Sequence, residues 1–591
     1  MSRYIFLWIG ILWFGTISVV GAEVIRVSAT QGDATPRIQA AIEKARQYRG
    51  KPVVIRLEQG NYHLFRTSCS KQVYYISNTA SEEENPDPTK HIGLWIRGIR
   101  NLTIEGDGAR LVTHGEMTSF VIDSSENIIL RNFTLTAADP SVPEMTVVDA
   151  GENYLTARIH PDSPYEIREG KFTWLGEGWN FTGGIAQVFE PWRNVTWRCN
   201  SPMSDVVKAI ELEKGLVRFN YNKRPEGRVG QVFQMRDAIR DEVCGLILKS
   251  KQVTLEDLNI HFLGNFGIVG QYSENLTYNR LNCTPEWGHG RTCAGFADFV
   301  QMSGCRGKVS ILDSRFEGAQ DDPINIHGTH LKVMDYPASN QVRVRFMHNQ
   351  SFGFEAFFKG DEVELVQVNS LRKLQSAWVK QVKRLDNYEI LLTLDRPVDE
   401  QVKQQPVVVE NVTWTPEVLI RNNYFSRIPT RGILVTTRRK VVIEKNIFFR
   451  TPMSAILISD DARSWYESGP VSDVTIRNNF FVECGSPVIS IAPENDRPEG
   501  AVHRNIRILA NRFALSGKEG IYARWTEGLD IRDNYFEYSE QLRPEDFIRL
   551  ENCESVQIEN NSDYPFMHLL YSQLLVCQRV CLQNTVCLIC K

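Results

Sequence analysis

Residues 418–536 contain five copies of one eight-residue pattern: VLIRNNYF (418–425), VVIEKNIF (441–448), VTIRNNFF (474–481), IRILANRF (506–513) and LDIRDNYF (529–536). Isoleucine stands at the third position of every copy, asparagine at the sixth and, in all five, phenylalanine at the eighth. The copies start 23, 33, 32 and 23 residues apart. A unit of about 23 residues with occasional insertions of about ten predicts the stacked coils of a parallel β-helix.

Strand geometry assigns a place to each repeated position. Because side chains alternate between the two faces of a strand, positions one and three should point into the solenoid, and the asparagines should stack at a turn. We therefore expect one buried column of isoleucines and a second column of asparagines. Weaker copies occur upstream as VTLEDLNI (253–260), LTYNRLNC (276–283) and VSILDSRF (309–316). A leucine-rich or helical solenoid is the alternative, but the asparagines and β-branched residues favour strands.

Two stretches interrupt the repeat, at residues 137–245 and 329–414. Both contain short runs of alternating apolar and polar residues separated by turn residues, which predicts antiparallel strands. They are too long to be loops. The expected fold is therefore all-β, a right-handed parallel β-helix with two inserted antiparallel β-barrel-like domains. The other expected segments are an N-terminal cap with the first coils (23–136), the coils that carry the active site (246–328), the C-terminal coils (415–563) and an atypical cysteine-rich tail (564–591).

Residues 1–22 are expected to be a signal peptide. Arg3 precedes an apolar run over residues 4–20, and small residues follow before Glu23. A membrane anchor is the alternative, because the run approaches the length that spans a bilayer. We expect an exported protein, periplasmic or secreted, without membrane association after cleavage. Export would permit disulfides among the 12 cysteines, and Cys283 with Cys293 could close a short loop. The net charge of −4 gives no reason to expect nucleic acid as a partner.

Three aspartates form the candidate catalytic site. Asp321 and Asp322 stand just before an apolar strand, and Asp298 lies 23 residues before Asp321, one basic coil earlier. We therefore expect Asp298 and Asp321 at equivalent positions of successive coils, about 4.8 Å apart. Carboxyl groups this close cannot all ionise near neutrality, so one should keep its proton, as glycoside hydrolysis requires. The pair Asp460-Asp461 shows that acidic pairs also arise in this chain without a stacked third aspartate.

A ten-residue insertion leads up to Asp298 and suggests a sugar subsite. It contains Glu286, Trp287, His289 and Arg291. An aromatic plate with hydrogen-bond donors beside the acids would bind a sugar, and His327, just after the acidic pair, is expected to contribute. A well-packed surface loop is the alternative. No metal is expected, because His327 and His330 lack further ligands at the spacing of a zinc site.

The motifs around the aspartates resemble two known families. Gln320-Asp321-Asp322, with an aspartate one coil earlier, resembles the polygalacturonase pattern on a β-helix. More closely, residues 24–540 resemble glycoside hydrolase family 110, the bacterial α-1,3-galactosidases. This resemblance covers the asparagine-ladder coils, both insertions and the motifs FADF (296–299) and AQDDPINIHG (319–328), and it extends to the presence of an export signal before them.

The resemblance to family 110 implies a function. It implies an exo-acting enzyme without a cofactor that removes terminal α-1,3-linked galactose, as in blood group B and linear α-galactosyl epitopes, with inversion at the anomeric carbon. It also implies that Asp298, Asp321 and Asp322 are catalytic. By the polygalacturonase pattern, Asp321 would be the general acid, and Asp298 and Asp322 would hold the nucleophilic water. The expected partner is a glycan that ends in α-galactose. Acceptance of fucosylated branches, and assembly as a homodimer, stay open.

Two other functions stay open as well. A hydrolase of uronate polysaccharides would need basic side chains to receive the substrate carboxylate. Only Arg291 and Arg306 are basic between residues 283 and 307, which disfavours this reading. A non-catalytic carbohydrate-binding β-helix would fit the repeats equally well, but uncompensated stacked carboxylates would destabilise such a face. An assay on a terminal α-galactoside distinguishes all three.

Overall fold

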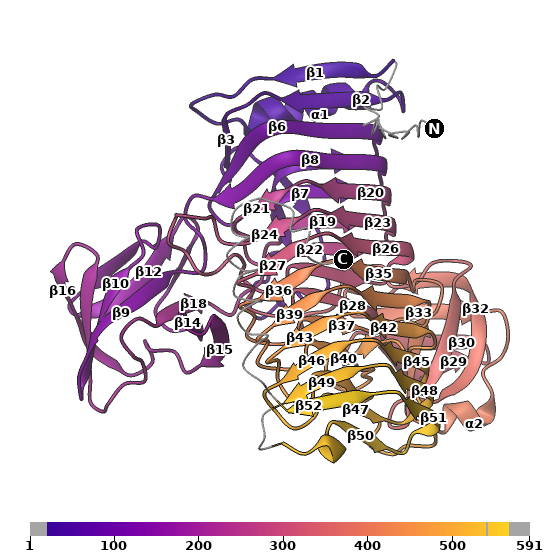
Figure 1. Cartoon of the computed structure of the whole chain (residues 1–591). Helices are drawn as coiled ribbons and strands as arrows, with labels where there is room; N and C mark the ends of the chain where they lie inside the picture. Colours follow the sequence, from indigo (N-terminus) through magenta and orange to yellow (C-terminus); the bar gives the residue numbers. More distant parts are fainter. Residues whose placement is uncertain (1–20, 539–541, 566–591) are drawn as a thin grey trace, which may run out of the picture.

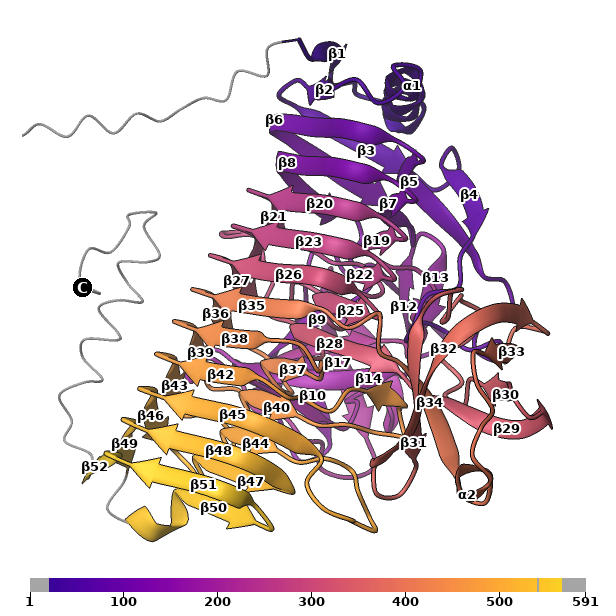
Figure 2. The ribbon, with the colours of Figure 1, turned by 90° about the vertical axis from the view of Figure 1, so that its right-hand side faces the viewer.

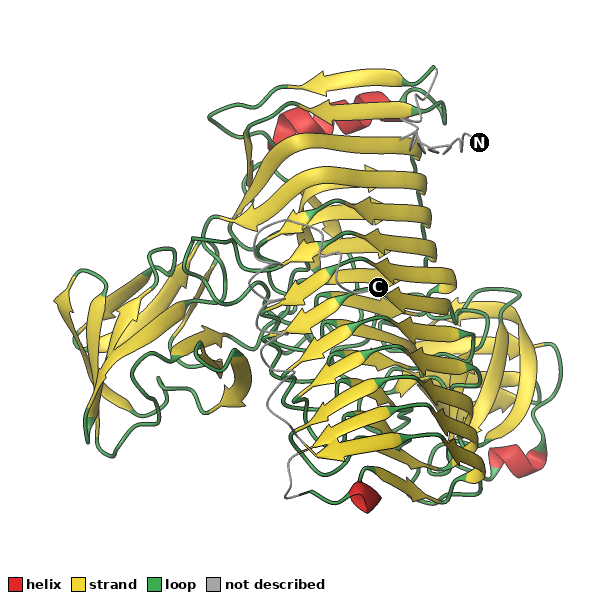
Figure 3. Ribbon diagram, in the orientation of Figure 1, coloured by secondary structure: helices red, strands yellow, loops and turns green. Residues whose placement is uncertain are grey.

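The computed structural model describes residues 21–538 and 542–565, so most of the expected signal peptide and the four cysteines of the tail lie outside the described residues. The chain forms a solenoid of stacked parallel strands, and two insertions project from it (Figures 1 and 3). One sheet contains 23 strands and a second contains 13. In the described ranges, no helix is long and apolar enough to cross a bilayer.

The five octapeptide copies form neighbouring strands of the larger sheet. These strands are β35 (Glu417–Arg421), β38 (Val441–Glu444), β42 (Val474–Arg477), β45 (His503–Leu509) and β48 (Thr526–Arg532). Their parallel register pairs Ile420 with Ile443 and continues in step to Ile531, and every isoleucine of this column is fully buried. Burial of one such side chain contributes about 1.5–3 kcal/mol. The predicted isoleucine column is confirmed.

The predicted asparagine column is also confirmed. Asn446 Nδ2 donates to Asn479 Oδ1 and to the carbonyl oxygen of Ile420, both at 3.0 Å, and the neighbouring coils repeat this pattern. The residue before each ladder asparagine has a left-handed backbone, such as Asn478 with φ of 55°. Asparagine and aspartate tolerate this conformation better than most residues, and one or the other precedes three of the five ladder asparagines. The phenylalanines at position eight stack in a third column.

A helix covers the N-terminal end of the solenoid. Helix α1 (Thr35–Arg46) lies next to β1 (Glu23–Val27), β2 (Val53–Leu57) and β5 (Thr89–Arg97), as Figure 2 shows. It buries Ile38, Ala41, Ile42 and Ala45 in the same core as the first coils. The helix thereby shields the apolar end of the solenoid from water.

The first insertion leaves the solenoid between β8 (Glu126–Ala137) and β19 (Gly245–Leu248). Its main sheet is antiparallel, with β15 (Val195–Cys199), β14 (Ile185–Glu190), β18 (Val232–Arg236), β9 (Glu144–Ala150), β10 (Tyr154–Ile159), β17 (Leu216–Tyr221) and β16 (Val206–Glu213) in spatial order. A small sheet of β11 (Tyr165–Arg168), β12 (Lys171–Gly176) and β13 (Trp179–Phe181) completes it. The insertion has a core of its own, which includes the fully buried Trp174 and Phe219.

The second insertion lies between β28 (Ile324–Thr329) and β35. It is a closed antiparallel barrel of β29 (Leu331–Ala338), β30 (Gln341–Arg345), β33 (Glu389–Leu394), β32 (Lys373–Arg384), β31 (Glu362–Gln367) and β34 (Val407–Asn411). The short helix α2 (Glu400–Lys403) precedes β34. Val344 and Leu392 are fully buried in a core that is separate from the core of the solenoid.

Cys283 and Cys293 do not form the disulfide that the sequence allowed. Both are buried free thiols. Cys283, on β24 (Asn282–Cys283), points into the core of the solenoid, whereas Cys293 packs in another apolar cluster with Phe296. The two thiols therefore face different cores. The loop between them is held instead by Glu144 of the first insertion, whose carboxylate accepts the backbone N–H of Cys293 at 2.9 Å.

Candidate active site

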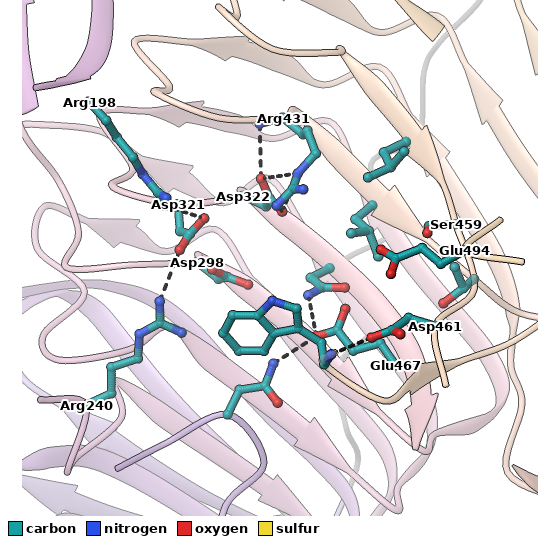
Figure 4. A pocket seen from close by; sticks show the side chains of 16 residues that line it. Arg198, Arg240, Asp298, Asp321, Asp322, Arg431, Ser459, Asp461, Glu467 and Glu494 are labelled. Atoms are coloured by element: carbon teal, nitrogen blue, oxygen red, sulfur yellow. Dashed lines mark hydrogen bonds and ion pairs between the residues drawn. The ribbon is translucent and has the colours of Figure 1, made fainter. Parts of the chain in front are cut away.

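A pocket with a volume of about 220 Å³ brings the three predicted aspartates together (Figure 4). Its floor comes from strands of the 13-stranded sheet, β28, β37 (Ile433–Val435) and β40 (Ile456–Ile458). Its walls come from loops of the solenoid and from the first insertion, through Arg198 on β15. The lining residues are Asn78, Arg198, Arg240, Asp298, Asp321, Asp322, Asn325, Arg431, Leu434, Thr436, Leu457, Ser459, Asp461, Trp465, Glu467 and Glu494.

The strand register corrects one detail of the predicted stacking. Val300 on β25 (Val300–Ser303) pairs with Ile324 on β28, which is a step of 24 residues. Asp298 and Asp322 each stand two residues before these partners. Asp298 is therefore equivalent to Asp322 on the next coil, and Asp321 is not its equivalent. The predicted step of 23 failed because this coil contains one more residue ahead of β28.

Asp321 is an ion-paired carboxylate. Arg240 Nη2 donates to its Oδ2 at 3.0 Å, and Arg198 Nη2 contacts its Oδ1 at 3.0 Å. Burial alone would raise the pKa of Asp321, but Arg240, Arg198 and nearby arginines together hold this pKa below its ordinary value. Asp321 is thus negatively charged in the free protein.

Asp322 has one strong partner. The Arg431 guanidinium contacts Asp322 Oδ2 from Nη2 at 2.8 Å and from Nε at 3.0 Å, and the Arg431 backbone N–H donates to Oδ1 at 3.0 Å. Such bidentate pairing between a guanidinium and a carboxylate fixes the orientation of the carboxylate. Burial and the charge of Asp321 nevertheless leave the pKa of Asp322 above its ordinary value, although Arg431 opposes them.

Asp298 is the carboxyl whose surroundings most strongly favour the protonated form. Its side chain is only 5% exposed, and burial raises its pKa well above the usual range. The negative charges of Asp321 and Asp322 raise this pKa further, and Arg240 only partly opposes them. Carboxyls that interact this strongly titrate as a group. Of the three carboxyls, Asp298 is therefore the one whose surroundings most favour keeping a proton.

The residues predicted to form a sugar subsite do not line this pocket. Glu286 is bound by Arg110 of the solenoid at 2.7 Å, and Trp287 is 88% exposed and does not line the pocket. Arg291 is buried and donates to Asp162 of the first insertion at 2.8 Å. These contacts attach the loop to the solenoid through Glu286 and to the first insertion through Arg291. The two charged residues are therefore used in contacts within the protein.

His289 belongs to the same domain contact. With His160 and Asp162 it forms a group of three metal-ligand types whose atoms lie within 4.8 Å of one another. His160 Nε2 lies 3.0 Å from the carbonyl oxygen of His289, and its Nδ1 contacts Asp162. Nε2 therefore donates to that carbonyl oxygen, and although burial opposes it, the Asp162 carboxylate raises the pKa of His160. Because Arg291 already neutralises Asp162, this group forms an ion-paired contact outside the pocket.

His327 lies behind the pocket wall. Its side chain is 2% exposed, and its Nδ1 lies 2.7 Å from the carbonyl oxygen of Gly328, which makes Nδ1 the donor. Nε2 then accepts from the Gln301 amide at 3.0 Å and lies 3.5 Å from a carboxylate oxygen of Glu467. His327 is therefore held by Gly328 and Gln301 and does not line the cavity.

Several lining residues were missed by sequence reasoning, for two reasons. Arg198 and Arg240 belong to the first insertion and the segment after it, and nothing in a sequence shows where an insertion docks. Asp461, Trp465 and Glu494 carried a usable signal, because the coils that start at residues 441 and 474 are about ten residues longer than the basic unit. The sequence pattern was used to predict a sugar subsite only for the insertion before Asp298. The acidic pair Asp460-Asp461, to which no function was assigned from the sequence, supplies the lining residue Asp461.

The arginines of the pocket overturn the reason for disfavouring a uronate hydrolase. Arg198, Arg240 and Arg431 all line the cavity, although none lies between residues 283 and 307. Each of them is ion-paired with Asp321 or Asp322. Basic side chains are therefore present, but their charges are already matched by the site's own carboxylates.

A parallel β-helix with a pocket of buried, proton-sharing carboxyls defines a carbohydrate-active protein of the glycoside hydrolase class. Family models match residues 143–233 as GLAA-B beta-barrel domain I, residues 341–408 as GLAA-B beta-barrel domain II and residues 407–563 as a right handed beta helix region. Alpha-1,3-galactosidase A of Bacteroides thetaiotaomicron is 48% identical over 93% of this chain and 98% of its own length. Alpha-1,3-galactosidase B of the same organism is 32% identical over 92% of this chain and 91% of its own. The chain belongs to this α-1,3-galactosidase family, glycoside hydrolase family 110.

A more distant likeness concerns a solved structure. The exopolygalacturonase of Thermotoga maritima is 10% identical, with a TM-score of 0.37, over 91% of this chain and 92% of its own. A likeness this weak supports no assignment of substrate.

Proposed function

We propose that the protein is an exo-acting hydrolase that removes terminal α-1,3-linked galactose from oligosaccharides and glycoconjugates. The observation that carries the proposal is the carboxyl cluster, in which burial and neighbouring carboxylates raise the pKa of Asp298 and arginines hold the pKa of Asp321 below its ordinary value. Hydrolysis of a glycosidic bond needs both a proton donor and a carboxylate. The relatives, named α-1,3-galactosidases, supply the substrate class.

Register and electrostatics constrain the roles of the three aspartates. Asp298 and Asp322 lie side by side on successive coils, which suits two groups that hold one water molecule. Asp321, whose side chain is 16% exposed, is left to protonate the leaving oxygen. In the free protein, however, the surroundings of Asp298 favour the proton more than those of Asp321 do. This division therefore requires the shared proton to pass to Asp321 when the substrate displaces one of its arginine partners.

The proposed reaction inverts the anomeric carbon. The acid protonates the glycosidic oxygen, and the water held by the other two aspartates attacks from the opposite face and gives up its proton to the base. An α-galactoside then yields β-galactose, and no cofactor takes part. A proton NMR time course of a fresh digest tests this step, because the β-anomer must appear before the α-anomer. Initial release of α-galactose would contradict it.

Asparagine variants of the three aspartates test the site. Each substitution keeps the shape of the side chain and removes its charge or transferable proton. Loss of general acid catalysis commonly lowers the rate about 10²–10⁴-fold. If Asp321 is the acid, Asp321→Asn should lose far less activity on an aryl α-galactoside with a good leaving group than on an α-1,3-linked disaccharide. Asp298→Asn and Asp322→Asn should be impaired on both.

Two outcomes decide between the proposals. Leaving-group dependence in Asp298→Asn, with Asp321→Asn impaired on both substrates, would move the acid role to Asp298, where the free protein keeps its proton. Near-normal activity of all three variants would place the catalytic centre elsewhere. A uronate hydrolase is the second candidate, favoured by the three arginines of the pocket. Comparison of an aryl α-galactoside with an aryl α-galacturonide tests it directly.

Location and assembly are part of the proposal. Export to the periplasm or the medium is supported by the apolar segment at residues 4–20, and fractionation of expressing cells tests it. Assembly as a homodimer stays a prediction, which light scattering of the purified protein checks. Removal of galactose from a blood group B glycan and from its unfucosylated counterpart distinguishes branched from linear specificity.

A further inference from the structure

Residues 461–467, here called the recognition loop, line the end of the pocket opposite Arg198 and Asp321 (Figure 4). The carboxylate of Asp461 accepts the backbone N–H groups of Arg463 at 2.8 Å, Ser464 at 2.9 Å and Tyr466 at 2.9 Å, and also that of Trp465. The backbone N–H of Asp461 donates to the carbonyl oxygen of Glu467 at 3.0 Å and closes the loop. Asp461 therefore fixes the loop from inside.

Besides Asp461, the recognition loop contributes two lining residues, Trp465 and Glu467. Tyr466 has a left-handed backbone, with φ of 59°, between Trp465 and Glu467, and both of these residues line the pocket. The ring of Trp465 stacks on His348 of the second insertion, with centroids 4.2 Å apart and planes tilted by 24°. One face of the indole is thereby supported by the protein, and Trp465 remains 43% exposed. It forms a rigid plate at the cavity.

Glu467 is held by one of its two carboxylate oxygens. Its Oε1 accepts from Asn78 Nδ2 at 2.9 Å and from Asn325 Nδ2 at 3.4 Å. Asn78 is itself fixed, because its Oδ1 accepts from the Ser351 hydroxyl at 2.8 Å. Among the residues that the structure describes, no donor contacts Oε2 of Glu467. A pre-oriented carboxylate oxygen is thus left for a donor that enters the pocket.

The charges at the two ends of the pocket differ. At the catalytic end, every arginine that lines the cavity is paired with Asp321 or Asp322. The carboxyl groups of Asp461, Glu467 and Glu494 line the other end. Burial and, to a smaller extent, the negative charge of Asp461 raise the pKa of Glu494. A sugar carboxylate here would meet like charges, whereas sugar hydroxyls would find acceptors.

We propose that the recognition loop binds the terminal sugar and selects a neutral galactose over galacturonate. The axial 4-hydroxyl of galactose leaves an apolar C–H face on one side of the ring, which stacks on Trp465, and Glu467 Oε2 accepts hydroxyl hydrogens of the same sugar. Glu467 and Trp465 are then specificity-determining residues, and His348 and Asp461 position them. This inference rests on the proposed function, because it names the sugar that the same pocket holds.

The variant Glu467→Gln is the sharpest test. If the amide oxygen takes the place of Oε1, the contacts with Asn78 and Asn325 persist, and an NH₂ donor replaces the free acceptor. Loss of a hydrogen bond to a charged group predicts a fall in kcat/KM of about 10- to 100-fold on an aryl α-galactoside. Calorimetry should show weaker binding of free galactose and a smaller preference for galactose over galacturonate. Glu499→Gln, an exposed glutamate paired with Arg372, is the matched control and should behave as wild type.

A second variant keeps the test decisive if Glu467→Gln does not fold. Trp465→Ala removes the plate and should raise KM about 10-fold or more with a smaller change in kcat, as expected when ground-state and transition-state binding fall together. His348→Ala should raise KM less, because the indole stays in place without its support. Unchanged galactose binding in Trp465→Ala, or in folded Glu467→Gln, would overturn the inference. A wild-type protein that cleaves no α-galactoside would instead refute the proposed function.

Discussion

The side chain of Arg431 donates hydrogen bonds to both carboxylate oxygens of Asp322, although the two residues are 109 positions apart in the sequence. They meet because the second insertion leaves the solenoid directly after β28 and returns directly before β35, so Arg431 stands on the coil that stacks next to Asp322. The barrel is thus inserted in the sequence, but the coils before and after it still stack directly on each other. The cluster of three aspartates consequently depends on a residue that follows the insertion.

Removal of the Arg431 charge should shift the acidic limb of the pH profile. In Arg431→Met the pKa of Asp322, already above its ordinary value, rises further, because the main opposing charge is lost. If Asp322 must be ionised to hold the water, kcat/KM should begin to fall at a higher pH than in the wild type. The measurement is kcat/KM against pH on an aryl α-galactoside. Arg439→Met, an exposed neighbour outside the pocket, should leave the profile unchanged.

Replacement of Asp298 by asparagine should stabilise the fold while it impairs catalysis. The folded protein raises the pKa of Asp298, so this group favours folding below its unfolded pKa of about 3.9 and loses that contribution as the pH rises through its folded pKa. Asparagine carries no charge at any pH. Asp298→Asn should therefore raise the melting temperature, and the gain should grow from pH 4 toward neutrality. A melting temperature below that of the wild type at neutral pH would contradict the assigned protonation.

Trp287→Ala should have little effect on catalysis. The side chain is 88% exposed and does not line the pocket, so KM and kcat on an α-galactoside should stay within about twofold of wild type. Trp465→Ala, which alters the indole that does line the pocket, provides the contrast. A large rise in KM for Trp287→Ala would show that the substrate extends beyond the described pocket toward the first insertion.

The asparagine ladder should be sensitive to single substitutions. In Asn479→Ala, the backbone N–H of Asn446 loses its acceptor, and the carbonyl of Ile443 loses its donor, both inside the solenoid. Each buried group left unpaired costs about 1–3 kcal/mol. We expect a melting temperature several degrees lower than that of the wild type, measured by calorimetry. Asn153→Ala, at an exposed position of the first insertion, is the control and should change it little.

The repeat was readable from the sequence because a buried strand position and a stacked amide each tolerate very few residue types. Ile476 and Asn479 recur in register for that reason, and the same register brought Asp298 near Asp322. The exact number of residues in this coil could not be predicted from the sequence. One added residue before β28 changes which aspartate is equivalent to Asp298, although the length of the coil stays close to the basic unit. Arg198 could not be predicted either, because it reaches Asp321 only after the first insertion docks, and that contact joins residues distant in the sequence.

Three units with separate apolar cores meet at the pocket: the solenoid supplies the acids, the first insertion supplies Arg198, and the second supports Trp465 through His348. Undocking of either insertion would disorganise the pocket while the solenoid remains folded. Heat inactivation should then precede the melting of the β-helix, and saturating galactose should narrow the gap between the two by holding the units together. The contacts between the three units, and not the core of the solenoid, would then set the temperature at which the enzyme loses activity.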